Sequence, residues 1–406
     1  MSGTTPTAVD VVIVGGGMVG ASLALALKGT DKRVALIEAV PPEAADQPSF
    51  DDRTSALGNG SRRIFETLGV WPQLAAHAVA VREIHVSDAG HIGGARLSAT
   101  EQGLAELGFV VPNRYIGQAL WRQLAAWPEL LIRSPARVSQ VRLTEQSARL
   151  TVTGTDTEEL MEARVVIAAD GARSMVRAAA AIAATIEDYG QVALVVQVGT
   201  DRPASGIAYE RFTRTGPLAV LPLADGHYTV VWTLAPERAQ EVLSLADAAF
   251  IHQLQLAFGW RIGRITRVGS RASYPLRLSR ADTMSGCRAV LVGNAAQALH
   301  PVAGQGFNLG LRDAALLAEL LAAAPDPGAP AVLETYELRR AADRRGMIGF
   351  TDSLVKLFAS NRAAVTAARS VGLMLFDVAP GAKRALSRLS WGFGGDTPRL
   401  LRGLSV

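Results

Sequence analysis

The feature that most constrains the fold is a strand, a glycine-rich loop, a helix and a second strand, in that order, over residues 11–38. A β-branched run precedes the loop Gly15-x-Gly17-x-x-Gly20, and the apolar pattern after it predicts a helix over 18–28. The second strand, over 33–37, ends on an acidic residue 18 positions past the last glycine. This order predicts the first unit of a Rossmann-like α/β domain.

The three glycines and the acidic residue each have a physical task in such a unit. Gly15 allows a tight turn, Gly17 lets the backbone approach a pyrophosphate, and Gly20 lets the helix pack against the strand. The carboxylate of Glu38 can accept both hydroxyls of an adenosine ribose, and its charge disfavours a 2′-phosphate. We therefore expect the ADP half of FAD or NAD, rather than NADP, at these four residues.

Two other interpretations of this segment are weaker. A glycine-rich turn without a ligand does not account for the acid that ends the second strand. Residues 11–27 are uncharged and approach the length of a membrane span or a signal segment. Three consecutive glycines, no basic residue ahead of the run and Lys28 at its end argue against both of these.

A second glycine-rich turn lies in residues 289–321. We expect a buried strand over 289–292, a polar loop with Asn294, a His300-Pro301 step and a Gly304-Gln305-Gly306 turn that opens a long amphipathic helix. Such a turn presents backbone N–H groups at the positive end of the helix dipole, where negative charge is stabilised. The segment predicts a contact to a second anionic part of one ligand.

A third signature, EARVVIAADGARSMVR, occupies residues 162–177. A buried strand over 165–169 delivers Asp170-Gly171 into a turn, and Ser174 can cap the short helix that follows. The carboxyl end of a parallel strand borders the crevice where ligands bind. Alone this segment would be an ordinary turn, but beside the two loops it predicts a third contact to the dinucleotide.

Between these α/β segments the pattern changes to antiparallel β-structure. Residues 83–98 look like a hairpin, and residues 206–234 alternate and turn at Gly216-Pro217 and Asp225-Gly226. The predicted fold class is α/β, with a Rossmann-like nucleotide domain interrupted twice by a mainly antiparallel β substrate domain. The first domain takes 1–82, 109–184 and 285–345, the second takes 83–108 and 185–284, and 346–406 form a C-terminal helical region.

Composition excludes several other classes of protein. The 406 residues allow two or three domains with a substantial core. The single cysteine, Cys287, rules out an intramolecular disulfide and a redox-active cysteine pair, and the histidine spacing predicts no metal site. The sequence has no basic strand with interleaved aromatic residues, so nucleic-acid binding is not predicted. The cytoplasm is the default compartment.

The excess positive charge lies at the C-terminus. The net charge is +4, and residues 346–406 hold eight Lys or Arg against three Asp. This tail also has apolar residues at helical spacing between Met347 and Phe358, and the run VGLMLF at 371–376. A basic amphipathic region can bind an anionic membrane surface, at about 1 kcal/mol per basic residue. Alternatively, it is a helical layer on the main domain or a contact with a partner subunit.

The three signatures resemble, in order and spacing, the fingerprints of single-component flavin-dependent aromatic hydroxylases. Residues 50–71 (FDDRTSALGNGSRRIFETLGVW) and GNAAQALHPVAGQGFNLGLRD resemble the ubiquinone-biosynthesis branch, and within it the 2-polyprenyl-6-methoxyphenol hydroxylases. The likeness extends through ERFTRTGPLAVLPLADG and QLAFGWRIG, so it covers nearly the full chain. It implies the aromatic-hydroxylase type of FAD-binding domain.

The resemblance also implies roles for single residues. The N-terminal glycines and Glu38 would hold the ADP half of FAD, with a further contact from Asp170-Gly171. Arg53, in the family's DxR segment, would approach the flavin. Asn294 stands where most flavin hydroxylases have Asp, and its amide would bond a ribityl hydroxyl. The border of the flavin pyrimidine ring would be formed by Gly304, Gln305, Gly306 and Asn308.

The implied reaction begins with reduction of FAD by NAD(P)H. O₂ then forms a flavin hydroperoxide, whose terminal oxygen is transferred to an electron-rich phenol carbon. Because a phenol has a pKa near 10, a base would help to activate the ring. His300 is the nearest titratable residue in the motif. The alternative is a structural role for His300, with the backbone around Pro301 shaping the oxygen site.

The implied substrate is a lipophilic polyprenyl phenol. Burial is worth about 0.8 kcal/mol per CH₂, so the tail will not lie free in water. The enzyme must dock at the membrane or receive its substrate from a protein of a ubiquinone-biosynthesis complex. We expect a cytoplasmic enzyme in peripheral contact with the inner face of the membrane through its C-terminal region.

Two rival functions remain at this point. One is a flavin hydroxylase that acts on another ring position or on a soluble aromatic acid. The other is a non-catalytic FAD-bound scaffold subunit of a biosynthetic complex. A pocket lined by arginine would favour the aromatic acid, whereas an apolar tunnel would favour the polyprenyl phenol.

Overall fold

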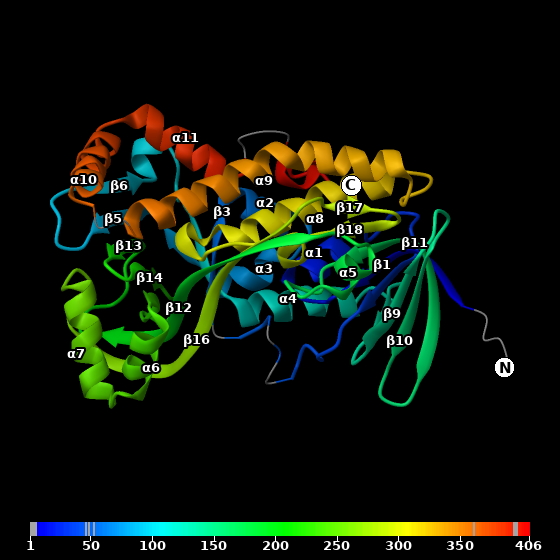
Figure 1. Ribbon diagram of the computed structural model, residues 1–406, viewed down its shortest axis with the longest axis horizontal. Helices are drawn as coiled ribbons and strands as arrows, with labels where there is room; N and C mark the ends of the chain where they lie inside the picture. The colour runs from blue at the N-terminus through cyan, green and yellow to red at the C-terminus, as the bar shows by residue number, and fades with distance from the viewer. Residues whose placement is uncertain (1–5, 45–46, 48, 52, 360–361, 393–396) are drawn as a thin grey trace.

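The computed structural model describes residues 6–44, 47, 49–51, 53–359, 362–392 and 397–406. Within these ranges the chain forms three sheets with helices packed around them (Figure 1). The first sheet contains a parallel core in the order β18-β11-β1-β2-β8. Its strands are β1 (Thr7–Val14), β2 (Val34–Ile37), β8 (Leu131–Arg133), β11 (Glu158–Ala168) and β18 (Ala289–Leu291).

The centre of the parallel core is buried on both faces, which explains its continuous β-branched sequence. Helix α1 (Met18–Ala26) packs against both α4 (Asn113–Ala125) and α8 (Gln305–Ala323). Strands β9 (Arg137–Leu143) and β10 (Ala148–Thr153) extend β11 into an antiparallel meander. Together these elements confirm the predicted Rossmann-like domain, whereas the sequence pattern did not indicate the meander.

The second sheet is mainly antiparallel, with the order β19-β16-β12-β15-β14-β13-β5-β6 and a single parallel pair, β13 with β5, among its described strands. Its long strands β12 (Ala184–Thr200) and β16 (Ile265–Ala281) run from the first domain into the second (Figure 1). The other strands are β5 (Glu83–Asp88), β6 (Gly94–Ser98), β13 (Ile207–Thr213), β14 (Gly216–Pro222), β15 (Tyr228–Leu234) and β19 (Gln297–Ala298).

This sheet confirms the expected hairpin at 83–98 and the meander at 206–234. The first turn of the meander lies at residues 214–215, so Gly216 is already the first residue of β14, entered with a φ of 133°. Helices α6 (Pro236–Ser244) and α7 (Asp247–Phe258) pack on one face around Phe250 and Leu254. The other face remains available to line a cavity.

A third, smaller sheet joins the two larger ones. It has the order β3-β7-β4 and consists of β3 (Thr54–Gly58), β4 (Val79–Val81) and β7 (Gly108–Pro112). The shorter remaining elements are α2 (Asn59–Thr67), α3 (Trp71–Leu74), α5 (Met175–Ala179) and β17 (Ser285–Gly286).

The C-terminal region is a layer of helices: α9 (Pro330–Ala359), α10 (Ala363–Asp377) and α11 (Pro380–Ser390). Helix α9 lies along α8, and α10 packs on β6 at the end of the molecule that carries the second sheet (Figure 1). The proposed domain limit at 345/346 falls inside α9, and the limits at 108/109 and 184/185 fall inside β7 and β12. In the described part of the chain, no helix has both the length and the apolarity to cross a membrane.

Candidate active site

One continuous cavity of about 1160 Å³ connects the N-terminal glycine loop with the C-terminal helices. Its walls include Glu38, Asp170 and the 292–307 segment at one end, and β3, β7 and the second sheet at the other. Residues from α10 and α11 close the far end. The volume exceeds the 300–1,000 Å³ typical of a single ligand site, so the cavity has room for a dinucleotide and a second ligand.

The glycine loop is held in a conformation that other residues cannot adopt. Gly15 has a φ of +102°, and a Cβ there would lie 2.4 Å from the Ala169 carbonyl oxygen on the neighbouring strand. A Cβ on Gly20 would lie 1.9 Å from the carbonyl oxygen of Gly15, so this glycine allows the helix to pack on the loop. Gly17 is the N-cap of α1 and lines the cavity without a side-chain cap. The first helical turn is therefore open to an anionic ligand.

The carboxylate of Glu38 is directed at the glycine loop. It accepts hydrogen bonds from the backbone N–H of Gly16 at 2.5 Å and of Val40 at 2.8 Å, and the side chain is only 8% exposed. The indole of Trp121 holds the loop from the other side by donating to the Gly16 carbonyl oxygen at 3.0 Å. Because a carboxylate has about four acceptor sites, Glu38 retains capacity for a ribose hydroxyl.

Asp170 brings an unsatisfied oxygen to the cavity. Its Oδ2 accepts a hydrogen bond from the Met175 N–H at 2.8 Å, whereas its buried Oδ1 has no partner among the described residues. Burial raises the pKa of this carboxyl, and the hydrogen bonds around it act in the opposite direction. The predicted cap is confirmed, since Ser174 Oγ accepts from the Arg177 N–H at 2.9 Å. A ligand hydroxyl would satisfy Oδ1.

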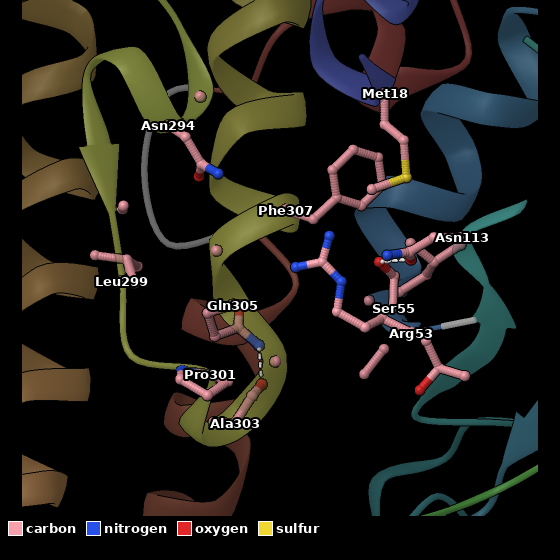
Figure 2. A pocket seen from close by; sticks show the side chains of 18 of the residues that line it. Met18, Arg53, Ser55, Asn113, Asn294, Leu299, Pro301, Ala303, Gln305 and Phe307 are labelled. Carbon is pink, nitrogen blue, oxygen red and sulfur yellow. Dashed lines mark hydrogen bonds between the residues drawn. The ribbon is translucent and has the colours of Figure 1, made fainter. Parts of the chain in front are cut away.

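The turn before α8 is strained and open towards the cavity. Ala303 and Gly304 both have left-handed backbone angles, with φ of 59° and 60°. Gln305 donates from Nε2 to the Ala303 carbonyl oxygen at 3.0 Å (Figure 2). Its Oε1 is buried and has no hydrogen-bond partner among the described residues. A Cβ on Gly306 would meet nothing within 4 Å. Such strain at a non-glycine residue is typical of a ligand-binding turn.

Comparison with known proteins identifies the family of this chain. A model of the FAD binding domain family matches residues 8–351. The chain belongs to this family. It is 37% identical to the ubiquinone hydroxylase UbiL of Rhodospirillum rubrum, over all of this chain and 95% of that protein. It is 32% identical to the 3-demethoxyubiquinol 3-hydroxylase of Escherichia coli, over 94% of this chain and 98% of that protein.

Solved structures agree on the fold. The p-nitrophenol 4-monooxygenase PnpA of Pseudomonas putida superimposes with a TM-score of 0.79 at 20% identity, over 96% of this chain and 99% of that one. The Pseudomonas aeruginosa protein PqsL superimposes with a TM-score of 0.77 at 21% identity, over 89% of this chain and 99% of that one. This FAD-binding chain thus has the aromatic-hydroxylase architecture that its sequence predicted.

The residues of the cavity fit FAD. The glycine loop and Glu38 lie at the end of β1 and β2, where the ADP half of the dinucleotide binds in this type of sheet. The orphaned oxygens of Asp170 and Gln305 and the open space beside Gly306 are the features that an absent polar ligand would explain. Asn294 lines the same wall (Figure 2), and Gly171 lines it next to Asp170.

Arg53 projects into the middle of the FAD-binding cavity. Figure 2 shows its guanidinium between the α8 turn and the wall formed by Ser55 and Asn113. Its Nε donates to Asp51 at 2.6 Å, and its guanidinium carbon lies 4.6 Å from the centre of the Tyr274 ring. The structure therefore places this cation on the cavity wall, and its approach to the flavin stays a prediction of the resemblance.

Asn308 and His300 lie behind the cavity wall and do not line it. The amide of Asn308 is fully used inside the protein. Its Oδ1 accepts from Gly58 N–H at 2.9 Å and Ser61 Oγ at 2.7 Å, and its Nδ2 donates to the carbonyl oxygens of Ala56 at 2.7 Å and Gly304 at 2.8 Å. Asn308 thus joins β3 and α2 to the turn that faces FAD, instead of bordering the ring itself.

His300 is a buried side chain that holds the strained turn before α8 through a hydrogen bond to its backbone. It is 1% exposed, its Nδ1 accepts from the Val302 N–H at 3.1 Å, and its ring meets the Tyr189 ring edge-on with centres 5.3 Å apart. Burial lowers the pKa of His300 to about 4, so the ring is neutral at pH 7. This environment fits the structural role, whereas Pro301 does line the cavity.

A buried ionic network that the sequence did not reveal holds the Asn294 loop in place. Asp313 on α8 accepts from Arg340 Nε at 2.8 Å, Gln297 Nε2 at 2.7 Å and the Gly293 N–H at 3.3 Å. Arg344 adds a bond from its Nε to Gln297 Oε1 at 2.9 Å. The network ties α9 to α8 and to the residue before Asn294. It depends on pairs of residues up to 47 positions apart, for which a single sequence offers no signal.

A second residue that sequence reasoning missed is Glu210, whose carboxyl lines the cavity in the middle of β13. The sequence does carry a signal for Glu210. It lies two positions from both Ala208 and Phe212, so it falls on the strand face that the alternating pattern predicts to be apolar.

Proposed function

We propose that this protein is an FAD-dependent monooxygenase that hydroxylates the ring of a polyprenylated methoxyphenol in ubiquinone biosynthesis. The overall reaction converts the phenol, O₂, NAD(P)H and a proton into the hydroxylated phenol, NAD(P)⁺ and water. The relatives named as ubiquinone hydroxylases support the pathway. The observation that carries the proposal is a single cavity whose FAD half continues into an apolar half.

The apolar half suits a lipophilic ring better than an aromatic acid. It is lined mainly by hydrophobic side chains, among them Ile84, Val86, Leu97, Leu107 and Leu221. Beyond the adenosine end, Arg53 and Glu210 are the charged side chains among the described residues that line it. Arg53 is already engaged with Asp51, and the carboxyl of Glu210 would repel a carboxylate substrate. A neutral phenol meets neither obstacle.

The prenyl tail would occupy the end of the cavity that lies under the C-terminal helices. There the lining side chains are Leu373 and Phe376 of α10, Leu386 of α11, and Trp391. Burial contributes about 0.8 kcal/mol per CH₂, so each five-carbon unit held in this branch adds several kcal/mol to binding. The helical layer thereby becomes part of the substrate site.

When bound, reduced FAD activates O₂ and supplies the oxygen atom that enters the ring. The protein's own contribution is positioning, charge and exclusion of water. The N-terminus of α8 at Gln305 stabilises negative charge near the flavin by about 1–2 kcal/mol in a partly buried geometry. The apolar walls keep water away from the site of oxygen transfer.

We also propose that α10 rests on the membrane surface. Outward-facing Val371, Met374 and Leu375 are 43–62% exposed, while Leu373 and Phe376 on the opposite side line the cavity. Exposed Val378 follows the helix, and exposed Arg384 and Arg388 lie on α11. An apolar patch with basic neighbours suits an anionic lipid surface and places the lipid source beside the tail branch.

The membrane proposal is tested by co-sedimentation with vesicles. The triple variant V371S/L375S/V378S should lose most binding to vesicles that contain anionic lipid, and raised salt should weaken wild-type binding. The matched control is L256S/W260S, which removes exposed apolar side chains on and just after α7, away from α10. Equal loss in both variants, or none in either, would contradict docking through α10.

The enzymatic proposal is tested by product analysis. Purified protein with FAD, NAD(P)H, O₂ and a short-tailed 2-prenyl-6-methoxyphenol should yield a product heavier by one oxygen atom, and mass spectrometry with ring-position standards identifies the carbon. A product at another ring position would support the first rival function. FAD binding without substrate-dependent NAD(P)H oxidation or product would support the non-catalytic scaffold.

A further inference from the structure

One carboxyl group in the cavity has no task in the chemistry described so far. Building on the proposed phenol hydroxylation, we propose that Glu210 is the general base that accepts the proton of the substrate's phenol hydroxyl. Four features of the molecule support this assignment: the face of the sheet on which Glu210 lies, its unsatisfied oxygen, its neighbours and its ionisation.

Glu210 is the charged side chain among the described residues of this sheet face that line the cavity. Asp88, opposite Phe212 on the same face, does not line it and is paired with Arg369 of α10. Alternate residues of a strand point to the same side, so Glu210 faces the cavity together with Ala208 and Phe212. Its cross-strand partners are Val86 on β5 and Ala219 on β14, and both of these line the cavity too. Burial of a carboxyl group among apolar side chains lowers the stability of the fold. Packing alone therefore does not explain a glutamate at this position.

The carboxyl of Glu210 has spare hydrogen-bonding capacity. Its Oε1 is buried and has no hydrogen-bond partner among the described residues. The group that approaches it is the backbone N–H of Ala303, in the strained turn directly before Gly304 and Gln305. Glu210 therefore lies between the sheet face that would hold the ring and the turn that faces FAD. A phenol hydroxyl in this space would satisfy Oε1 by donating to it.

The ionisation of Glu210 suits a base at neutral pH. Burial raises the pKa of its carboxyl to about 7, and the Ala303 N–H opposes the rise. Of the other charged groups on the cavity wall, Arg53 lies in the middle, while Glu38, Arg137, Asp170 and Arg173 belong to the adenosine end. Neutral His300 lies behind the turn. A base works best when its pKa is close to the operating pH.

The proposed step is a proton transfer that involves no redox change. The O–H bond of the phenol breaks, a new O–H bond forms on the Glu210 carboxylate, and the electron pair remains on the phenol oxygen. The resulting phenolate is more electron-rich at the ring carbons ortho and para to that oxygen. In a 2-prenyl-6-methoxyphenol both ortho carbons carry substituents, so the step favours attack at the para carbon. After oxygen transfer, the C–H bond of the attacked carbon breaks and its proton leaves to solvent, which restores the aromatic ring as a phenolate. Glu210 then returns its proton to the phenolate oxygen, so the residue is unchanged over the cycle.

The first test measures phenol ionisation without turnover. Oxidised holoenzyme is titrated with short-tailed 2-prenyl-6-methoxyphenol in the absence of NAD(P)H, and the difference absorbance of bound phenolate is followed. Wild-type protein at pH 8 should show the phenolate band, and E210Q should bind the phenol without it. E210D should keep a weaker band, because it retains a carboxylate on a shorter side chain.

The second test measures product formation against pH. The rate for wild-type enzyme should rise through a pKa near 7, and E210Q should lose this inflection with a fall of at least about 100-fold at pH 7. A fluorinated phenol that ionises near pH 7 should restore much of the E210Q rate, which a structural defect would not allow. E241Q on exposed α6 is the matched control, and it should retain wild-type rates and FAD content.

The outcomes separate this inference from the proposed function. If E210Q shows the phenolate band and the wild-type pH profile, Glu210 is not the base, even though the hydroxylase function stands. If wild-type enzyme forms no product from the phenol, the proposed function fails first. If E210Q loses FAD, the E210D variant decides the question. An E210D protein that retains FAD but shows neither the phenolate band nor the inflection in the pH profile would overturn the base role.

Discussion

At the residue scale, the backbone of the glycine loop restricts which residue types can occupy its positions. Gly15 combines a positive φ with the approach of a neighbouring strand, so both the conformation and the space exclude a side chain. The four described hydrogen bonds of Asn308 join β3 and α2 to the carbonyl oxygen of Gly304 in the turn before α8. The residues that line the cavity are therefore held in place by residues that do not line it.

Replacing Gly15 by Ala should abolish FAD binding. The new Cβ would lie 2.4 Å from the Ala169 carbonyl oxygen, which can only be relieved by opening the loop. Gly29→Ala is the matched control, because Gly29 also has a positive φ, of +83°, but open space around a Cβ. Its strain, about 1 kcal/mol, should lower stability slightly and leave FAD bound. Flavin absorbance of the purified proteins measures the FAD content of both variants. A G15A protein that retains one FAD per chain would contradict the expectation.

Replacing His300 by Asn should make the protein less sensitive to acid. The pKa of His300 in the fold is about 4, below its ordinary value of 6.5. Its neutral form therefore contributes stability that is present above pH 6.5 and is lost as pH falls towards 4. Asn can still accept from the Val302 N–H but does not titrate.

The measurement for His300 is the free energy of unfolding in urea at pH 7 and at pH 5. Wild-type protein should lose about 2 kcal/mol more than H300N between these two values. His252→Asn on exposed α7 is the control and should follow wild type. An equal loss in wild type and H300N would show that His300 is not neutral in the fold.

At the element scale, the position of α9 on α8 is decided by charged side chains that are almost fully buried. Arg340 bridges Asp313 at 2.8 Å and Asp343 at 2.6 Å, and Arg312 reaches Asp343 at 2.8 Å. The amphipathic pattern after residue 346 predicted helices there, and the helical layer on the main domain is confirmed. Two of its eight basic residues, Arg369 and Lys383, are buried and paired with Asp88 and Asp377, so the exposed positive charge is smaller than the sequence count indicates.

Replacing Asp313 by Asn should both destabilise the protein and loosen FAD. It leaves Arg340 with one carboxylate in a buried site, which costs about 3–5 kcal/mol. It also weakens the bonds to Gln297 and to the Gly293 N–H, which hold the loop of Asn294. Thermal unfolding and FAD affinity should fall together. E241Q breaks an exposed pair and should cost less than about 1 kcal/mol, and a D313N protein that behaved like it would contradict this account.

At the scale of the whole molecule, the cavity is made by three parts of the chain that are distant in sequence. The α/β domain supplies the FAD half, the second sheet supplies the wall with Glu210, and α10 and α11 close the tail branch. Since α9 continues through residue 345 without a break, the proposed domain limit at that residue falls inside one helix.

Filling the tail branch should discriminate between substrates of different length. Leu386→Trp places a large ring beside Phe376 and Trp391, where the cavity ends under α11. The KM for a long-tailed phenol should rise about tenfold or more, while a phenol with one prenyl unit should be unaffected. Overpacking costs about 1–3 kcal/mol, so thermal unfolding and FAD content are measured in parallel. Equal effects on both substrates would place the tail elsewhere.

The sequence by itself determined the parallel core and the cofactor, and it predicted the glycine loop and the acid that line one end of the cavity. These features are local, because a glycine loop between a strand and a helix permits few backbone conformations and its acid follows within one βαβ unit. The hairpin at 83–98 and the meander at 206–234 were predictable for the same reason, since alternation and turn residues are read within short windows.

Only the tertiary structure decided which residues share the cavity. His300, Pro301 and Asn308 lie within nine positions of one another, yet only Pro301 lines it. Glu210 and Ala303 are far apart in the chain and meet because the second sheet packs against the turn before α8. Burial, which sets the pKa values of Glu210 and His300, is a property of the packed molecule and not of the local sequence.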